Sequence, residues 1–264
     1  MDQNAAIDTT VAHPARRYNY WLGGKDNFAA DRANGDAVEA AMPTIRLMAM
    51  ENRRFLGRAA RFLAEQGIRQ FLDIGTGIPA PGNTHEVVQA VDPTAKIVYV
   101  DNDPIVLSHA RALLTSAPSG TVDYLDADLR DPRTILADAA KTLDFTQPVG
   151  LLLVAVLHFI RDDEDPQAIV TTLLDALPSG SYLVATHATW EFNPPEVVEK
   201  LQAANPDGRF VPRDGADFVR LFDGLEPVEP GLISVAHWRA EGEAEQPRPA
   251  AEDVSCFGFV ARKP

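Results

Sequence analysis

The sequence holds few features of a secreted, membrane-bound or disulfide-linked protein. Its 264 residues include one cysteine, Cys256, so no disulfide can form within the chain, as is usual in a reducing cytoplasm. No apolar run approaches the roughly 20 residues that cross a bilayer. The opening residues, MDQNAAIDTT, lack the basic and apolar parts of a secretory signal. We therefore expect a cytoplasmic protein with no membrane partner.

Positive charge is also scarce. The chain has 24 Lys and Arg against 38 Asp and Glu, a net charge of −14. Residues 1–68 are close to neutral, so the excess of acid lies in the rest of the chain. A protein that binds a nucleic acid duplex needs a basic face to neutralise phosphates. We therefore expect no nucleic acid partner.

Alternating strands and helices dominate the middle of the sequence. Short apolar segments that end in glycine, acid or turn residues predict strands at 71–75, 96–103, 121–129, 149–160 and 180–189. Continuous apolar strands are typical of a parallel sheet that is covered on both faces. The pattern predicts a doubly wound α/β sheet.

Both ends of the chain depart from this alternation. Residues 28–66 predict a helix broken at Pro43, within an N-terminal helical extension over residues 1–67. The main domain then covers residues 68–264 and includes an insert at 188–231 with two short helical pieces. Two final segments, 232–240 and 254–263, predict an antiparallel hairpin at one edge of the sheet.

The loop after the first strand contains Gly75-Thr76-Gly77, and Ala80 completes a G-x-G-x-x-A pattern. Such glycines let a ligand approach the backbone closely, and dinucleotide enzymes use them too. Here prolines delay the next helix, whereas a pyrophosphate site needs the helix N-terminus at the loop. Asp73 would repel a pyrophosphate, but its carboxylate suits an ammonium group.

Two further acids close the next strands. Asp101 at the end of the second strand can accept hydrogen bonds from both hydroxyls of a ribose. Asp128 at the end of the third can accept from an exocyclic amine such as that of adenine. A ligand with an amino-acid end, a ribose, an adenine and no phosphate is S-adenosylmethionine.

These motifs also carry a family resemblance. LDIGTG, VYVDND and DADL resemble the motifs of class I S-adenosylmethionine-dependent methyltransferases. ARRYNYWLGGKDNFAADR, QFLDIGTGIPAPGNTHEVVQAVDP and VAVLHFI resemble the actinobacterial S-adenosyl methyltransferase family, once catalogued as a domain of unknown function. The resemblance implies a seven-stranded Rossmann-like methyltransferase sheet with an antiparallel last strand, and S-adenosylmethionine as cofactor. It implies no substrate.

The remaining candidates surround the same strand ends. Asn102, Asp103 and Leu129 are expected near the adenine, and the backbone of Ala155 and Val156 beside the methionine part. His158 and His187 follow or end strands and are candidate general bases; the alternative is that they pack as core residues. The six histidines are scattered and predict no metal site.

The N-terminal stretch predicts a lid, which we define as residues 14–35. Ligands of open α/β sheets bind outside the carboxyl ends of the strands, and this side needs a cover. Tyr18, Gly23, Gly24 and Asn27 are the residues expected to close on the cofactor, and Arg53 could pair with its carboxylate. The alternative is a helical leader that only buries its aromatic rings.

The sequence therefore predicts a methyltransferase that acts on a small-molecule acceptor by in-line transfer, with the 188–231 insert on the acceptor side. One alternative is a non-catalytic module that binds S-adenosylmethionine as a sensor. A less favoured alternative is an NAD-dependent oxidoreductase. The acceptor and the oligomeric state stay open.

Overall fold

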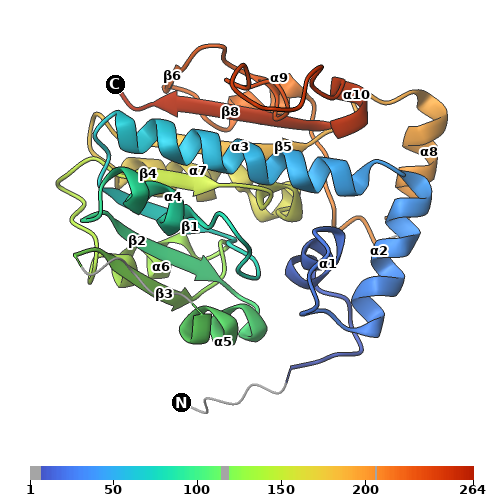
Figure 1. Cartoon of the computed structure of the whole chain (residues 1–264), viewed down its shortest axis with the longest axis horizontal. Helices are drawn as coiled ribbons and strands as arrows, with labels where there is room; N and C mark the ends of the chain where they lie inside the picture. The colour runs from blue at the N-terminus through green and yellow to red at the C-terminus, as the bar shows by residue number, and fades with distance from the viewer. Residues whose placement is uncertain (1–6, 114–118, 206) are drawn as a thin grey trace.

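The computed structural model describes residues 7–113, 119–205 and 207–264. Its centre is a sheet with the strand order β3-β2-β1-β4-β5-β8-β6, in which β7 also pairs with β8. The first five strands are parallel, and β8 runs antiparallel to β5 (Figure 1). Their bounds are β1 (Gln70–Ile74), β2 (Lys96–Asp101), β3 (Thr121–Asp126), β4 (Gly150–Leu153), β5 (Tyr182–Ala188) and β8 (Cys256–Arg262). The predicted Rossmann-like sheet with an antiparallel end is confirmed.

The edge beyond β8 differs from the prediction. The long strand expected at 232–240 is wrong: only β7 (Ile233–Ser234) forms there, and β6 (Glu226–Pro227) adds a second short piece. The chain turns after β7 so that Trp238 is fully buried, edge-on to Phe55 at 5.5 Å between ring centroids. The apolar side chains of this segment pack in the core, and its backbone does not continue as a strand of the sheet. Within the described residues the sheet therefore has eight strands, where seven were expected.

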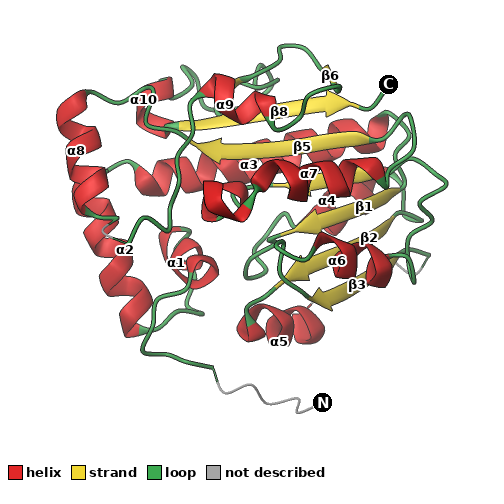
Figure 2. Ribbon diagram, turned by 180° about the vertical axis from the view of Figure 1, so that it is seen from behind, coloured by secondary structure: helices red, strands yellow, loops and turns green. Residues whose placement is uncertain are grey.

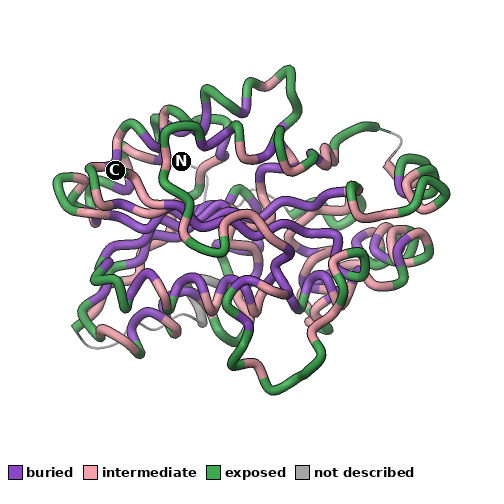
Figure 3. The backbone as a smooth tube through the Cα atoms, turned by 90° about the horizontal axis from the view of Figure 1, so that it is seen from above, coloured by how far each residue is buried: buried purple, intermediate pink, exposed green. Residues whose placement is uncertain are grey.

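Alternate residues of the strands pack under two helical layers, with the buried sheet between them (Figure 3). One face, which includes Phe71 and Ile97, meets α3 (Ile45–Glu65), α4 (Thr84–Val91) and the short α10 (Ala251–Val254). The other, which includes Leu72 and Val98, meets α6 (Pro132–Ala139), α7 (Pro166–Asp175) and α9 (Gly215–Arg220). The sheet is covered on both sides, as its apolar strands predicted.

Local signals set several helix starts. The side chains of Asn83 and Glu86 form the predicted capping box at the start of α4. Pro104 opens α5 (Pro104–Leu113), where its missing N–H has no role in the helix. Pro43 separates α2 (Ala29–Ala41) from α3, so the predicted break is confirmed.

The N-terminal helices lie beyond the carboxyl ends of the parallel strands. Figure 2 shows the strand arrowheads of β2 and β5 directed toward α1 (Pro14–Trp21) and α2, with α8 (Pro195–Ala203) beside α2. This is the side where ligands of open α/β sheets bind. Of the helices in the described ranges, none is both long and apolar enough to span a bilayer.

Candidate active site

The glycine loop after β1 is held by the acid that ends β2. Gly75 and Gly77 have φ angles of 77° and 68°, which glycine adopts without strain. A Cβ on Gly75 would stand 2.6 Å from a methyl carbon of Val156, so the loop packs directly on the segment after β4. The backbone N–H of Gly77 donates to Asp101 Oδ2 at 2.8 Å. Three strand ends therefore meet at this loop.

Asp101 is 7% exposed, and burial raises the pKa of its carboxyl. Its Oδ1 accepts the backbone N–H of Asp103 at 2.9 Å. Each carboxylate oxygen thus takes one backbone donor and keeps a lone pair for another. The side chain can still accept from the two hydroxyls of a ribose.

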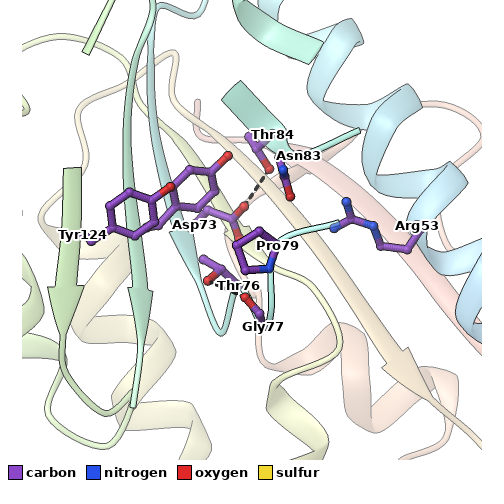
Figure 4. Close-up of a pocket in the computed structure, with 9 residues that line it drawn as sticks. Arg53, Asp73, Thr76, Gly77, Pro79, Asn83, Thr84 and Tyr124 are labelled. Atoms are coloured by element: carbon purple, nitrogen blue, oxygen red, sulfur yellow. Dashed lines mark hydrogen bonds between the residues drawn. The ribbon is translucent and has the colours of Figure 1, made fainter. Parts of the chain in front are cut away.

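A recess opens beside the loop and joins residues from α3, α4 and the three strands β1, β2 and β3. It is lined by Arg53, Asp73, Thr76, Gly77, Pro79, Asn83, Thr84, Tyr99 and Tyr124 (Figure 4). Asp73 is 5% exposed and accepts from Thr84 Oγ1 at 2.6 Å, and burial raises its pKa to about 6. Arg53 reaches in from α3 and donates through Nη2 to the carbonyls of residues 80–82 at 3.2 to 3.4 Å. The recess therefore holds a carboxyl and a guanidinium, the two groups that an amino-acid end requires.

The two tyrosines of this recess were not predicted. Asp73, Tyr99 and Tyr124 occupy equivalent positions on β1, β2 and β3, and the two rings stack at 5.2 Å. The hydroxyl of Tyr99 accepts the N–H of His85 at 2.8 Å, whereas the buried hydroxyl of Tyr124 has no partner among the described residues. Alignment of the three predicted strand ends would have found them, since each lies a short, fixed distance from its strand end.

The acids expected near the adenine separate into two groups. Asp128 accepts from Asn102 Nδ2 at 2.7 Å and from the backbone of Arg130 at 2.9 Å, and it also pairs with the Arg130 guanidinium at 3.2 Å. Leu129 is 5% exposed and packs in the core, leaving only its backbone near this edge. The side chain of Asp103 contacts the N-terminal segment: it binds Arg16 Nε at 2.9 Å and His13 Nδ1 at 3.0 Å. Its hydrogen bonds outweigh burial, which alone would raise its pKa, and hold the pKa well below the usual range.

The segment after β4 contains a strained residue. Ala155 has a φ of 55°, an uncommon backbone conformation for a residue with a Cβ. Its N–H donates to Thr186 Oγ1 at 2.8 Å, which fixes the turn toward the glycine loop. Backbone strain of this kind concentrates at functional sites.

His158 and His187 lie behind this segment in an aromatic cluster. His158 is 5% exposed, and its Nδ1 accepts the N–H of Ala188 at 3.4 Å. His187 Nε2 lies 3.1 Å from the carbonyl of Val211, and its ring stacks on Phe218. Burial lowers the pKa of His158 well below its usual value and that of His187 to about 3, so both are neutral at pH 7. Their catalytic role stays a prediction.

The predicted lid residues contact α3 and one another. The hydroxyl of Tyr18 donates to the carbonyl of Ala49 at 2.9 Å, which fastens α1 to α3. Asn19, which sequence reasoning missed, accepts from Asn27 Nδ2 at 3.0 Å and closes the loop around Gly23 and Gly24. A Cβ on Gly24 would stand 2.2 Å from the Asn19 side chain. Gly23 has a φ of 79° and no neighbour within 4 Å of such a Cβ.

Comparison with known proteins identifies the family. Residues 1–264 match the family described as S-adenosyl methyltransferase. The protein belongs to the S-adenosyl methyltransferase family. It is therefore an S-adenosylmethionine-dependent methyltransferase, and S-adenosylmethionine is its cofactor. Both the oxidoreductase and the non-catalytic sensor interpretations are set aside.

Two solved structures resemble this S-adenosyl methyltransferase along almost its whole length. A DUF574 family protein from Streptomyces avermitilis is 43% identical, with 98% of this chain and 100% of that chain covered and a TM-score of 0.90. A protein from Thermobifida fusca is 39% identical, with 97% of each chain covered and a TM-score of 0.87. Both sources are actinobacteria, as the resemblance implied. None of the curated proteins matches the chain.

A more distant structure shares the fold alone. The N-methyltransferase NodS from Bradyrhizobium japonicum, in complex with S-adenosyl-L-homocysteine, is 14% identical. The match covers 82% of this chain and 88% of that chain, with a TM-score of 0.50.

The site of this S-adenosyl methyltransferase fits its cofactor. The recess contains the carboxyl of Asp73 and the guanidinium of Arg53. Asp101 keeps a free lone pair on its carboxylate oxygens. The hydrogen-bonded side chains of Asn102 and Asp128 lie just beyond the ends of β2 and β3. Among the described residues, the buried carboxyl of Asp73 accepts from Thr84 but has no ion pair, and the buried hydroxyl of Tyr124 has no hydrogen-bond partner. These groups match an amino-acid end, a ribose and an amine.

Proposed function

We propose that this protein transfers the methyl group of S-adenosylmethionine to a small-molecule acceptor at the carboxyl edge formed by β1, β2 and β4. The observation that carries the proposal is the recess that brings Arg53 and Asp73 together beside the glycine loop. In this arrangement Arg53 binds the carboxylate of the cofactor and Asp73 its ammonium group. Asp101 binds the ribose hydroxyls, and Asp128 with Asn102 the adenine amine.

The bound cofactor supplies an electrophilic methyl group, so the protein has mainly to position the acceptor and exclude water. The turn at Ala155, packed through Val156 on Gly75, gives a rigid floor for this positioning. His158 is neutral and buried, so it can take a proton only directly from a bound acceptor. Its Nδ1 accepts the N–H of Ala188, so His158 remains a candidate base for an acidic acceptor hydroxyl only where this hydrogen bond opens, with His187 behind it.

The position of the N-terminal segment supports its role as a lid. Helix α1 lies over the carboxyl edge and reaches β2 through Arg16 and α3 through Tyr18 (Figure 1). The described part of the extension over residues 1–67 then includes the lid, the rest of α2 and α3, and the insert at 188–231 borders the acceptor side. Within the insert, Arg213 is 8% exposed and donates to the carbonyls of Leu157 and Ile160, so it supports the His158 segment from behind.

A small acceptor agrees with the charge of the chain. Its net charge of −14 opposes the approach of nucleic acid phosphates.

The test is a calorimetric titration of S-adenosylmethionine, followed by turnover to S-adenosylhomocysteine with pooled small metabolites as acceptors. We expect binding by the wild-type protein and a large loss in Arg53→Met. The surface variant Arg61→Met on the same helix is the control, and we expect its affinity to be unchanged. Equal affinity in Arg53→Met and Arg61→Met would refute the assigned orientation of the cofactor.

A further inference from the structure

Arg130 lies just beyond the end of β3, in the turn that follows Asp128, and its guanidinium contacts three groups at once. Nη1 lies 3.2 and 3.4 Å from the two carboxylate oxygens of Asp128. Nε and Nη2 donate to the two oxygens of Glu164 at 2.6 and 3.3 Å. Nη2 also donates to the carbonyl of Phe159 at 2.8 Å. The side chain therefore joins the end of β3 to the segment after β4.

The contacts with Glu164 and Phe159 anchor the guanidinium. Glu164 Oε2 accepts the backbone N–H of Arg161 at 2.7 Å, so the carboxylate is held by its own turn. The segment around Phe159 is held as well, because Arg213 donates to the carbonyls of residues 157 and 160. The position of the Arg130 guanidinium is therefore fixed by the segment after β4, independently of Asp128.

The carboxylate of Asp128 has one direction left in which to accept a further donor. Oδ1 accepts the backbone N–H of Arg130 and its nearer contact from Nη1, whereas Oδ2 accepts Asn102 Nδ2 at 2.7 Å. A carboxylate oxygen has two lone pairs, so Oδ1 is filled and Oδ2 keeps one. Burial would raise the pKa of Asp128, but the hydrogen bonds from Arg130 and Asn102 outweigh burial and lower the pKa. The side chain is therefore an ionised acceptor whose direction its neighbours set.

We propose that Arg130 is a positioning residue that makes the cofactor site selective for an amino group on the purine. The inference rests on the proposed function, in which Asp128 accepts from the adenine amine. The amine donates to the free lone pair of Oδ2. A purine with an oxo group in place of the amine presents an acceptor there, and a carboxylate that cannot turn away repels it. The selectivity thus depends on the anchor of Arg130 at Glu164 and Phe159.

A simpler role for Arg130 is to neutralise the charge of Asp128. The two roles make different demands on the side chain. A lysine supplies the same charge, but its ammonium is a single point and cannot bridge Asp128 and Glu164 as the planar guanidinium does. A comparison of arginine with lysine therefore separates positioning from charge.

The experiment compares S-adenosylhomocysteine with its 6-oxo analogue, S-inosylhomocysteine, by calorimetric titration. We expect the wild-type protein to prefer the amino form at least about tenfold, as a hydrogen bond to a charged group provides. In Arg130→Met and in Arg130→Lys this preference should fall below about threefold, because the carboxylate can then turn away from the oxo group. Glu164→Gln weakens only the anchor and should give an intermediate preference. The control is Arg161→Met, which removes an exposed contact with Asp163 and should keep the full preference.

The outcomes separate this inference from the proposed function. If the wild-type protein does not bind S-adenosylhomocysteine, the proposed function fails. If it binds both forms equally, the assigned adenine contact fails and the role of Arg130 with it. A full preference in Arg130→Met or in Arg130→Lys overturns the positioning role alone. The Arg130 side chain is 43% exposed, so we expect folded variants, checked by thermal melts. If Arg130→Met does not fold, the comparison rests on Arg130→Lys and Glu164→Gln.

Discussion

Replacement of Arg16 by methionine would test how the lid is fastened to the cofactor edge. Arg16 donates from Nε and Nη2 to the two oxygens of Asp103, at 2.9 and 3.1 Å. The side chains are 5% and 0% exposed. Loss of one partner of a buried pair costs about 3–5 kcal/mol, because the other charge stays buried. In the variant, the carboxylate of Asp103 still binds His13 and the backbone N–H of Ile105. We therefore expect the free energy of unfolding to fall by about 3 kcal/mol, near the lower end of this range.

The free energy of unfolding is measured by urea denaturation, and cofactor affinity by calorimetry. The double variant Arg16→Met/Asp103→Leu should recover part of the loss, because it also removes the stranded carboxylate. The folded-state pKa of Asp103 is lowered, so the pair stabilises the protein above about pH 4 and loses this effect as the pH falls through the folded-state pKa. The difference between wild type and Arg16→Met should therefore shrink in acid.

A loss of less than about 1 kcal/mol in Arg16→Met would refute this reasoning, since it would equal that of an exposed pair. A double variant that is less stable than Arg16→Met would also contradict it. Tyr18→Phe serves as the matched control on the same helix. It removes two hydrogen bonds, one to the carbonyl of Ala49 and one from Asn52 Nδ2, each worth about 1 kcal/mol, and leaves the Arg16 pair intact.

Three other predictions concern the glycine loop, the recess and the lid. Asp101→Ala should weaken S-adenosylmethionine binding at least about tenfold in a calorimetric titration, with the exposed Asp126→Ala as control; equal affinities would contradict the assigned ribose contact. Asp73, with its pKa raised to about 6 by burial, binds more protons when folded. The stability of the cofactor-free protein should therefore fall by up to about 3 kcal/mol between pH 4 and 6, and this slope should disappear in Asp73→Asn. Gly24→Ala should destabilise the lid, since its Cβ would stand 2.2 Å from Asn19, whereas Gly57→Ala in open space on α3 should stabilise by about 0.5–1 kcal/mol in thermal melts.

The central sheet could be predicted because local patterns decide it. Fully apolar strands such as β4 require cover on both faces, and the Asn83 and Glu86 capping box depends on four adjacent residues. The antiparallel pairing at the last edge is confirmed, but the length of its first strand could not be predicted, for the opposite reason. The apolar pattern around Trp238 looks the same whether the segment pairs as a strand or turns into the core, and tertiary packing on α3 decides between them.

The candidate site was predictable where each strand end supplies its own residue, as with Asp73 and Asp101. Contacts between distant segments were not. Arg16 and Asp103 lie 87 residues apart, so no local sequence pattern predicts that they form an ion pair. Tyr99 and Tyr124 needed the register between strands, which the sequence suggests only after the strand ends are aligned.

The contact between the lid and Asp103 has a consequence for turnover. The backbone of Asp103 donates to Asp101, the proposed ribose ligand, while its side chain holds Arg16, so Asp103 connects the proposed cofactor site to α1. Binding of the ribose by Asp101 and docking of α1 on Asp103 would then be coupled, so that each makes the other more favourable. Where exchange of the cofactor requires α1 to move, Arg16 must be released from Asp103 each time. The rate of this opening, and not the methyl transfer itself, would then set the upper limit on how fast the enzyme cycles.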